Sequence, residues 1–346
     1  MPLRSKTAVI RQDTPAADIQ KMSTRKILSA DIGGTNSRFG CFETDAAGRL
    51  ALVGSKWFRT GDADSFTRLI TMVNQSDFPL RSSDSDMAVF AVAGPVEKNG
   101  VYSAPPLIPW DIDITNARDD YGLRRCALIN DFIAQAFATR TPAGKSAQEI
   151  LPGNIPPDGT VAVIGAGTGL GKAALVPGNA GSYVAVPSEG GHASFPFVSD
   201  PEFKFQKFVM RELGEEYLTG NHIVSGKGLS LIHKFLTGEK LEPKEVVTRC
   251  TPASETLAWA ARFYGRTCRN YALEVLSLGG MYIAGGVAAK LPGMLTHKAF
   301  GEEFRSSKTM SRILEQISVF LITNEESGLW GAALLGQQML KKEGAF

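Results

Sequence analysis

The sequence has few of the residues that build metal centres and disulfide frameworks. Its 346 residues include only four cysteines and four histidines. The cysteines are far apart and form no C-x-x-C pair, and the histidines show no H-E-x-x-H spacing. This scarcity argues against a structural transition metal and against disulfide bonds. We therefore expect unpaired thiols in a cytoplasmic protein.

The sequence also lacks a large excess of either positive or negative charge, and it lacks long hydrophobic runs. The 37 basic and 35 acidic residues leave a net charge of +2, which gives no basic surface for nucleic acid. No apolar run approaches the ~20 residues that a membrane-spanning helix needs. Residues 1–26 are basic but lack the apolar core of a secretory signal. We expect no nucleic-acid or membrane partner, and we interpret 1–26 as a poorly ordered extension.

What the sequence does contain is an alternation of strand and helix patterns. A hydrophobic content of 43% in 346 residues suffices for two domains of a globular protein. Apolar runs predict strands at 27–32, 38–42, 87–92, 126–129, 281–284 and 319–323. Apolar residues every three or four positions predict helices at 132–139, 254–278 and 329–340. The Pro- and Gly-rich segment 141–160 predicts a domain boundary.

Two segments share one plan of strand, glycine-rich turn and strand. They are ILSADIGGTNSRFGCF at 27–42 and VAVIGAGTGLGKAALV at 161–176, and Gly34-Thr35 in the first corresponds to Gly167-Thr168 in the second. Glycine turns can direct backbone N–H groups at an anion. The repeat predicts two related domains that face each other across a cleft, where ligands commonly bind.

The second turn does not match the two common nucleotide motifs. A Rossmann fingerprint would need glycine where the chain has Leu170. A Walker A loop would need glycine at Ala166 and a hydroxyl side chain at Ala173. Both motifs lack residues on which their mechanisms depend.

Polar residues follow two of the predicted strands. Asn130 and Asp131 come at the end of the strand at 126–129, a usual place for active-site residues in α/β proteins. The alternative is that Asp131 only caps the following helix. Glu189 and His192 flank two glycines in a second polar segment, which suits either vicinal hydroxyls or an ordinary surface loop.

Six motifs occur together in the order and approximate spacing of the bacterial glucokinases. These motifs are DIGGTNSR (31–38), INDF (129–132), GAGTGLG (165–171), EGGH (189–192), SGKG (225–228) and IAGGV (283–287). The sequence resembles this family, of the hexokinase/actin-like ATPase superfamily, over about 27–340. The resemblance implies an α/β fold with two domains of the hexokinase/actin-like (ribonuclease H-like) type and an interdomain cleft. The smaller domain would comprise 27–140 plus 322–346, and the larger one 141–321.

The resemblance also implies an activity and a set of roles. The activity is phosphorylation of the 6-hydroxyl of a hexose, with glucose as the expected substrate, by ATP and Mg2+. Asp131 would be the general base and Asp31 would hold magnesium through water. Sugar hydroxyls would be bound by Asn130, Asp131, Glu189, His192 and Asn221. ATP would be bound by Gly33, Gly34, Thr35, Asn36, Gly167, Thr168, Gly169, Gly285 and Gly286. The family resemblance further implies a homodimer.

Two positions depart from the family pattern on the sugar side. Asn221 stands where these glucokinases usually carry glutamate, and Leu107 stands where they commonly carry asparagine. An amide lacks the charge-assisted hydrogen bonding of a carboxylate. Two alternatives therefore stay open: a kinase of the same fold for another sugar or amino sugar, and a catalytically silent sugar-binding regulator.

Overall fold

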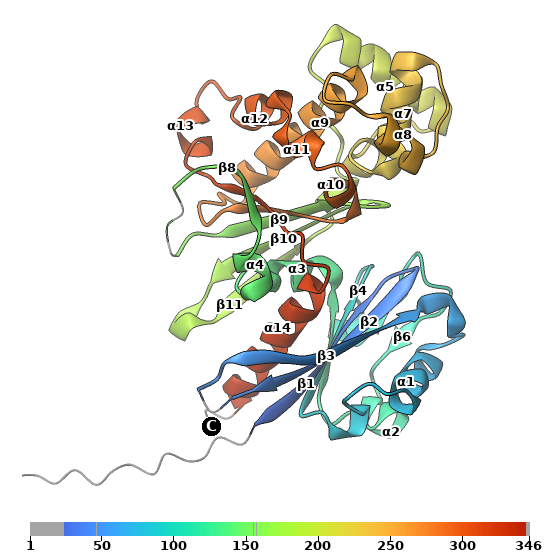
Figure 1. Cartoon of the computed structure of the whole chain (residues 1–346), viewed down its shortest axis with the longest axis vertical. Coiled ribbons are helices and arrows are strands. Elements are labelled where there is room, and N and C mark those ends of the chain that lie inside the picture. The colour runs from blue at the N-terminus through green and yellow to red at the C-terminus, as the bar shows by residue number, and fades with distance from the viewer. Residues whose placement is uncertain (1–23, 46, 155, 157, 344–346) are drawn as a thin grey trace, which may run out of the picture.

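The computed structural model describes residues 24–45, 47–154, 156 and 158–343, which form two lobes, each built on a mixed β-sheet (Figure 1). The first sheet has the strand order β3-β2-β1-β4-β7. Its strands are β1 (Arg25–Ile32), β2 (Asn36–Thr44), β3 (Leu50–Arg59), β4 (Met87–Val92) and β7 (Cys126–Asn130). A small two-stranded sheet lies beside it, made of β5 (Tyr102–Ser103) and β6 (Ile112–Asp113).

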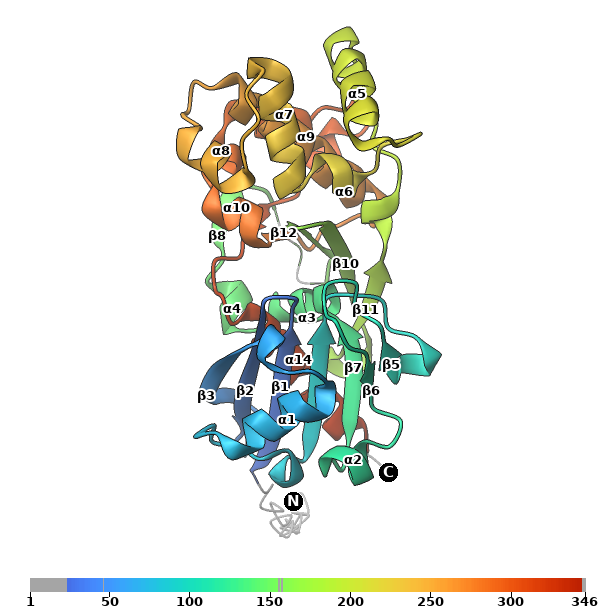
Figure 2. The ribbon, with the colours of Figure 1, turned by 90° about the vertical axis from the view of Figure 1, so that its right-hand side faces the viewer.

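The strand β4 lies inside the first sheet and is buried on both faces, so it is apolar throughout. In β4, Ala88 and Phe90 belong to the core cluster beneath α1 (Phe66–Gln75). The alternating residues Met87 and Val89 pack instead with Ala332 of α14 (Ser327–Glu343). Figure 2 shows α1 and α2 (Ala117–Tyr121) on one side of this sheet and α14 on the other. Period-two packing thus explains the unbroken apolar run of β4.

The second sheet has the strand order β11-β10-β9-β12-β13-β8. Its strands are β8 (Gln148–Leu151), β9 (Val161–Ala166), β10 (Leu170–Pro177), β11 (Tyr183–Ser188), β12 (Met281–Ala284) and β13 (Val319–Leu321). Helices from α5 to α13 cover its far side (Figures 1 and 2). The longest of them, α9 (Glu255–Glu274), is buried along most of its length.

The remaining helices are short or lie in the outer layer of the lobe that contains the second sheet, which we call the upper lobe (Figure 1). They are α3 (Asp131–Ala138), α4 (Pro142–Lys145), α5 (Asp200–Leu213), α6 (Gly220–Ile223), α7 (Gly226–Thr237), α8 (Pro243–Arg249), α10 (Gly286–Lys290), α11 (Gly293–Thr296), α12 (Lys298–Phe304) and α13 (Ser311–Leu314). Among the described residues, no helix combines the length and the apolar character needed to cross a lipid bilayer.

The two sheets repeat one topology. In the first, β1 pairs antiparallel with β2 and parallel with β4. In the second, β9 pairs antiparallel with β10 and parallel with β12. The two hairpins, β1–β2 and β9–β10, are the two segments whose sequences share the glycine-rich plan. The predicted internal repeat is therefore confirmed at the level of topology.

Most predicted elements are present, and two end earlier than predicted. The segment 141–160, predicted to hold a domain boundary, contains α4 and β8. The helix predicted for 254–278 ends at Glu274, since Leu276 adopts a left-handed backbone conformation with φ of 47°. The strand predicted for 319–323 ends at Leu321. In addition, β1 begins at Arg25, inside the predicted extension, whose residues 1–23 lie outside the described part of the chain.

Candidate active site

Asn130 and Asp131 lie where β7 gives way directly to α3. Asn130 is the N-cap of α3, and its Oδ1 accepts a hydrogen bond from the backbone N–H of Phe132 at 2.9 Å. Its Nδ2 donates to the carbonyl of Gly94 at 3.1 Å, which ties the end of β4 to the start of α3. Asp131 is the first helical residue and not the cap, although its Oδ1 also accepts from Phe132 N–H at 3.0 Å. The alternative that Asp131 serves as the N-cap is therefore wrong, because Asn130 fills that position.

The carboxyl group of Asp131 has an unusual electrostatic environment. Burial, the nearby carboxylate of Asp31 and, to a smaller extent, that of Glu189 together raise its pKa to about 7, against the opposing hydrogen bond from Phe132 N–H. A carboxyl group with a pKa near neutrality can both accept and release a proton at physiological pH. The environment of Asp131 therefore suits a group that takes part in proton transfer.

Phe132 fixes Asp131 relative to the second sheet. A side chain on Gly171 would overlap the Phe132 ring, and a Cβ on Gly165 would lie 2.9 Å from its Cζ. The ring thus lies directly on the two strands that flank the second glycine-rich turn. Because Asp131 is the neighbouring residue, this contact sets the position of its carboxyl group with respect to that turn.

Asp31 lies at the end of β1 and pairs with Arg38 of β2. The two residues are opposite each other in the antiparallel register, and Arg38 Nη1 is 3.4 Å from Asp31 Oδ2. Burial raises the pKa of Asp31, while the guanidinium of Arg38 lowers it. Arg38 also stacks over Trp57, with 4.0 Å between its Cζ and the ring centroid, and donates to the carbonyl of Glu325 at 3.1 Å. The Asp31 carboxylate remains about one-fifth exposed.

The first turn, Gly33–Asn36, is held from two sides. Gly33 N–H donates to the carbonyl of Asn36 at 3.0 Å, and Thr60 Oγ1 donates to the carbonyl of Gly33 at 2.6 Å. A Cβ on Gly34 would lie 2.8 Å from both Cβ and O of Leu107. Only glycine at 34 permits this approach. Thr35, by contrast, is exposed at the tip.

The second turn, Gly167–Gly169, contacts the start of α7. Gly167 N–H donates to Gly169 O at 2.8 Å, and Gly226 N–H donates to Gly167 O at 3.0 Å. Gly167 is open, with no atom within 4 Å of a Cβ built on it. Thr168 and Gly169 are exposed. An anion can therefore approach this backbone.

Gly285 and Gly286 adjoin the second turn. Gly285 has a φ of 88° and is the N-cap of α10, and a Cβ on it would lie 2.7 Å from the carbonyl oxygen of Ala166. Gly286 is open, with nothing within 4 Å. These glycines therefore let α10 begin directly beside the strand that leads into the second turn.

Glu189 and His192 lie in the turn after β11, and both side chains are mostly exposed. Glu189 Oε2 and His192 Nε2 are 3.9 Å apart. Ser188 Oγ accepts from Gly190 N–H at 3.1 Å, which fixes the start of this turn. The turn faces Asp131 closely enough for Glu189 to influence its pKa.

Asn221 connects the second turn to the Glu189–His192 turn. Its Oδ1 accepts from Leu170 N–H at 2.7 Å. The same oxygen would lie 2.7 Å from a Cβ on Gly191 and 3.2 Å from a Cβ on Gly169. Part of its hydrogen-bonding capacity is therefore used within the protein. This role is not apparent from sequence, because Asn221 and Leu170 are 51 residues apart.

No group of three or more His, Cys, Asp or Glu side chains that could hold a metal ion occurs among the described residues. Magnesium usually binds through one or two carboxylates, substrate phosphates and water. Asp31, partly exposed at the first turn, is a suitable carboxylate for that arrangement.

A pocket of about 480 Å³ lies on the α7 side of the second turn and was not predicted. Lys227, Ser230 and Lys234 line it from α7, opposite Lys240 and Pro243. The Ser230 hydroxyl makes no hydrogen bond among the described residues. Lys227 belongs to the SGKG motif, and that motif is the one sequence signal for this pocket.

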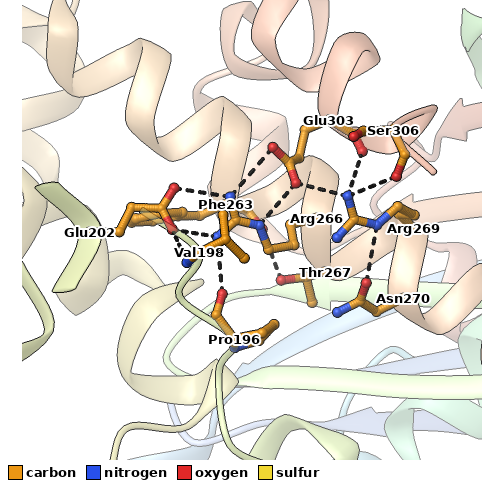
Figure 3. Close-up of polar contacts among 10 residues, drawn as sticks. All are labelled: Pro196, Val198, Glu202, Phe263, Arg266, Thr267, Arg269, Asn270, Glu303 and Ser306. Atoms are coloured by element: carbon orange, nitrogen blue, oxygen red, sulfur yellow. Dashed lines mark hydrogen bonds and ion pairs between the residues drawn. The ribbon is translucent and has the colours of Figure 1, made fainter. Parts of the chain in front are cut away.

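A buried charge cluster anchors the segment that follows the Glu189–His192 turn (Figure 3). Arg266 of α9 donates to both carboxylate oxygens of Glu202, at 2.6 and 3.0 Å, and to the carbonyl of Pro196 at 3.0 Å. Its Nε contacts Glu303 at 2.9 Å, and Arg269 contacts the same carboxylate at 2.9 Å. Arg266 and Glu202 are both almost fully buried. The cluster therefore links residues 196–202 rigidly to α9 and α12.

Comparison with known proteins places the chain among sugar kinases. The family model described as Glucokinase matches residues 28–339. The glucokinase of Nostoc punctiforme is 30% identical over 348 residues, covering 90% of this chain and 99% of that protein. The glucokinase of Caulobacter vibrioides is 32% identical, covering 89% of this chain and 94% of that protein.

A solved structure agrees with these sequence relatives. The crystal structure of a glucokinase from an Antarctic psychrotroph superposes with a TM-score of 0.77 at 27% identity, covering 90% of this chain and 99% of that one. This similarity and the repeated sheet topology confirm the predicted α/β fold of the hexokinase/actin-like type. With a family match across most of its length, the chain belongs to the glucokinase family.

Proposed function

We propose that the protein transfers the γ-phosphoryl group of ATP to the 6-hydroxyl of D-glucose, giving glucose 6-phosphate. The observation that carries this proposal is Asp131, whose pKa of about 7 arises from burial near Asp31 and Glu189. Its proximity to both the first turn and the Glu189–His192 turn suits a base that lies between nucleotide and sugar. Membership of the glucokinase family supplies the reaction class.

In this mechanism Asp131 accepts the proton of the 6-hydroxyl as that oxygen attacks the γ-phosphorus. The bond between the γ-phosphorus and the β,γ-bridging oxygen breaks, and ADP leaves. The carboxylate also holds the nucleophile in line, and positioning provides much of the catalysis of phosphoryl transfer. Closure of the two lobes would exclude water, which could otherwise accept the phosphoryl group.

The sugar would contact the turn after β11 and the end of β7. Glu189 and His192 have free, exposed side chains for hydroxyl groups. Asn130 already uses one donor and one acceptor for Gly94 and Phe132, so it retains one N–H and one lone pair for a sugar. Asn221 is partly used in the same way, and its remaining amide N–H groups would face the sugar.

The nucleotide would lie along the two glycine-rich turns. Gly33–Asn36 and Gly167–Gly169 would direct backbone N–H groups at its phosphates, and Gly285 and Gly286 would let the adenosine approach the backbone. Magnesium held by Asp31 through water would neutralise charge on the phosphates. The open Gly167 and Gly286, together with the exposed Thr168, support this placement.

The domain limits, assembly and location complete the proposal. We assign 27–140 plus 322–346 to the smaller domain and 141–321 to the larger one, supported by the separate sheets and by α14, which packs on the first sheet. We further propose a cytoplasmic homodimer, as the family resemblance implies. The net charge of +2 supports the absence of a nucleic-acid partner.

Kinase activity on a different sugar is the second candidate. It is favoured by Asn221 and by Leu107, an exposed apolar side chain against Gly34 of the first turn. A coupled ADP-release assay over a panel of hexoses and amino sugars separates the two candidates. The highest kcat/KM with glucose supports glucokinase activity, and turnover of another sugar without glucose turnover supports the alternative. Sugar binding without any turnover would refute both.

A further inference from the structure

Lys172 is a buried ammonium group for which the proposed mechanism has no use. It lies on β10, opposite Ser188 in the antiparallel register, and only 6% of its surface is exposed. Its Nζ is 5.0 Å from the centroid of the Tyr271 ring, and within the described chain it makes no hydrogen bond or ion pair. A buried charge without an acceptor is costly. The polypeptide supplies only the Tyr271 ring and the more distant carboxylate of Glu274 to stabilise this charge.

The ammonium group borders a small pocket beneath the Glu189–His192 turn. The pocket has a volume of about 60 Å³, enough for a single halide or a few water molecules. Asn270 and Ser194 line it with an amide N–H and a hydroxyl group, and neither donates a hydrogen bond to another side chain or backbone group among the described residues. Glu274 is the acidic residue of the lining, and it is exposed at the rim. The interior thus carries mainly hydrogen-bond donors and one positive charge.

We propose that this pocket binds a small monovalent inorganic anion, such as chloride, with Lys172 as its counter-charge. Water could satisfy the N–H donors of Lys172, whereas an anion would also add to the partial neutralisation that Glu274 provides. Burial lowers the pKa of Lys172 and Glu274 opposes that change. A bound anion would likewise favour the charged ammonium.

The anion would also support the turn above it. Lys172 Nζ would lie 3.3 Å from a Cβ on Gly190, so the ammonium lies directly against the turn that carries Glu189 and His192. A neutralised, hydrogen-bonded ammonium would hold this turn in one position. The anion is thereby expected to lower the KM for sugar, an expectation that rests on the proposed function.

Chloride binding to the sugar-free protein tests the site independently of activity. The measurement is the line width of 35Cl in NMR, titrated at constant ionic strength with sodium glutamate as the other salt. The wild type is expected to broaden the signal saturably. Lys172→Met, which keeps the length of the side chain and removes the charge, should weaken the affinity about tenfold or more. Lys308→Met, at an exposed position away from the pocket, should leave it unchanged.

Glu274→Gln provides a variant whose expected change in chloride affinity is opposite to that of Lys172→Met. Removing the rim carboxylate should tighten chloride binding, and this exposed helical position is tolerant of substitution. No saturable broadening by the wild type would overturn the proposal, as would equal broadening by wild type and Lys172→Met. Sugar kinetics in the same two salts measure whether the anion lowers the KM for sugar through the Glu189–His192 turn. Failure of sugar turnover would count against the proposed function and leave the binding result standing.

Discussion

Asn221 Oδ1 accepts a hydrogen bond from the backbone N–H of Leu170 at 2.7 Å. This bond joins the start of α6 to the residue that ends the second glycine-rich turn. Asn221, for which we propose a sugar contact, therefore also supports the second glycine-rich turn, for which we propose a nucleotide contact.

Replacing Asn221 by leucine should loosen the second turn. The variant leaves Leu170 N–H without its partner, a loss of about 1–2 kcal/mol, and we expect the KM for ATP to rise about tenfold. Asn221→Asp keeps an acceptor at Oδ1 and should retain most of the ATP affinity. Steady-state kinetics with varied ATP measures both variants. Equal KM values for ATP in wild type and Asn221→Leu would contradict this role.

The position of Asp131 should depend on the packing of Phe132 against Gly171. Gly171→Ala places a methyl group where the ring lies, so α3 must move. A displacement of about 1 Å can cost on the order of 100-fold in rate, and we expect such a loss in kcat. Gly61→Ala is the matched control, because nothing lies within 4 Å of a Cβ there. The prediction is wrong if both variants turn over at the wild-type rate.

The charge cluster around Arg266 should dominate the stability of the upper lobe. Arg266→Met leaves the carboxylate of Glu202 buried without a counter-charge and with only Val198 N–H as a hydrogen-bond donor, and we expect a loss of about 3–5 kcal/mol in the free energy of unfolding. Arg269→Met removes a more exposed partner of Glu303 and should cost less. Urea denaturation followed by circular dichroism measures both. A loss of less than about 1 kcal/mol for Arg266→Met would show that the cluster is not strongly coupled to folding.

Asp131 should make stability depend on pH. Its pKa rises from 3.8 to about 7 on folding, so the folded protein binds this proton more tightly than the unfolded chain. The stability contributed by that proton is full below pH 3.8 and is lost as the pH rises through 7. Asp131→Asn carries no charge and should gain in Tm relative to the wild type between pH 5 and 8. A constant difference in Tm over this range would argue against the raised pKa.

The sequence was sufficient to predict the parts of the fold that depend on local pattern. β4, β12 and the hairpins around both glycine-rich turns follow from apolar runs and glycine positions. The repeated topology followed from comparing two such hairpins. Within 141–160, α4 and β8 were not predicted, because four prolines and three glycines outweighed the short apolar run that forms β8.

The contacts that orient the candidate site could not be predicted in the same way. Phe132 lies on Gly171, Thr60 holds Gly33, and Asn221 holds Leu170 across 51 residues. Each is a tertiary contact between segments with no common periodicity. Arg266 looked like one polar residue in a long amphipathic helix, and only packing shows that its guanidinium meets two glutamates.

The most direct test of the account compares wild type and Asp131→Asn in a coupled ADP-release assay with glucose and Mg-ATP, together with glucose binding by calorimetry. We expect glucose-dependent ADP release by the wild type and a rise in its kcat/KM through about pH 7 as Asp131 loses its proton. Asp131→Asn should lose turnover while keeping glucose affinity within about tenfold. Wild-type rates in Asp131→Asn would contradict the assignment of the base, and absence of sugar phosphorylation by the wild type would contradict the proposed function.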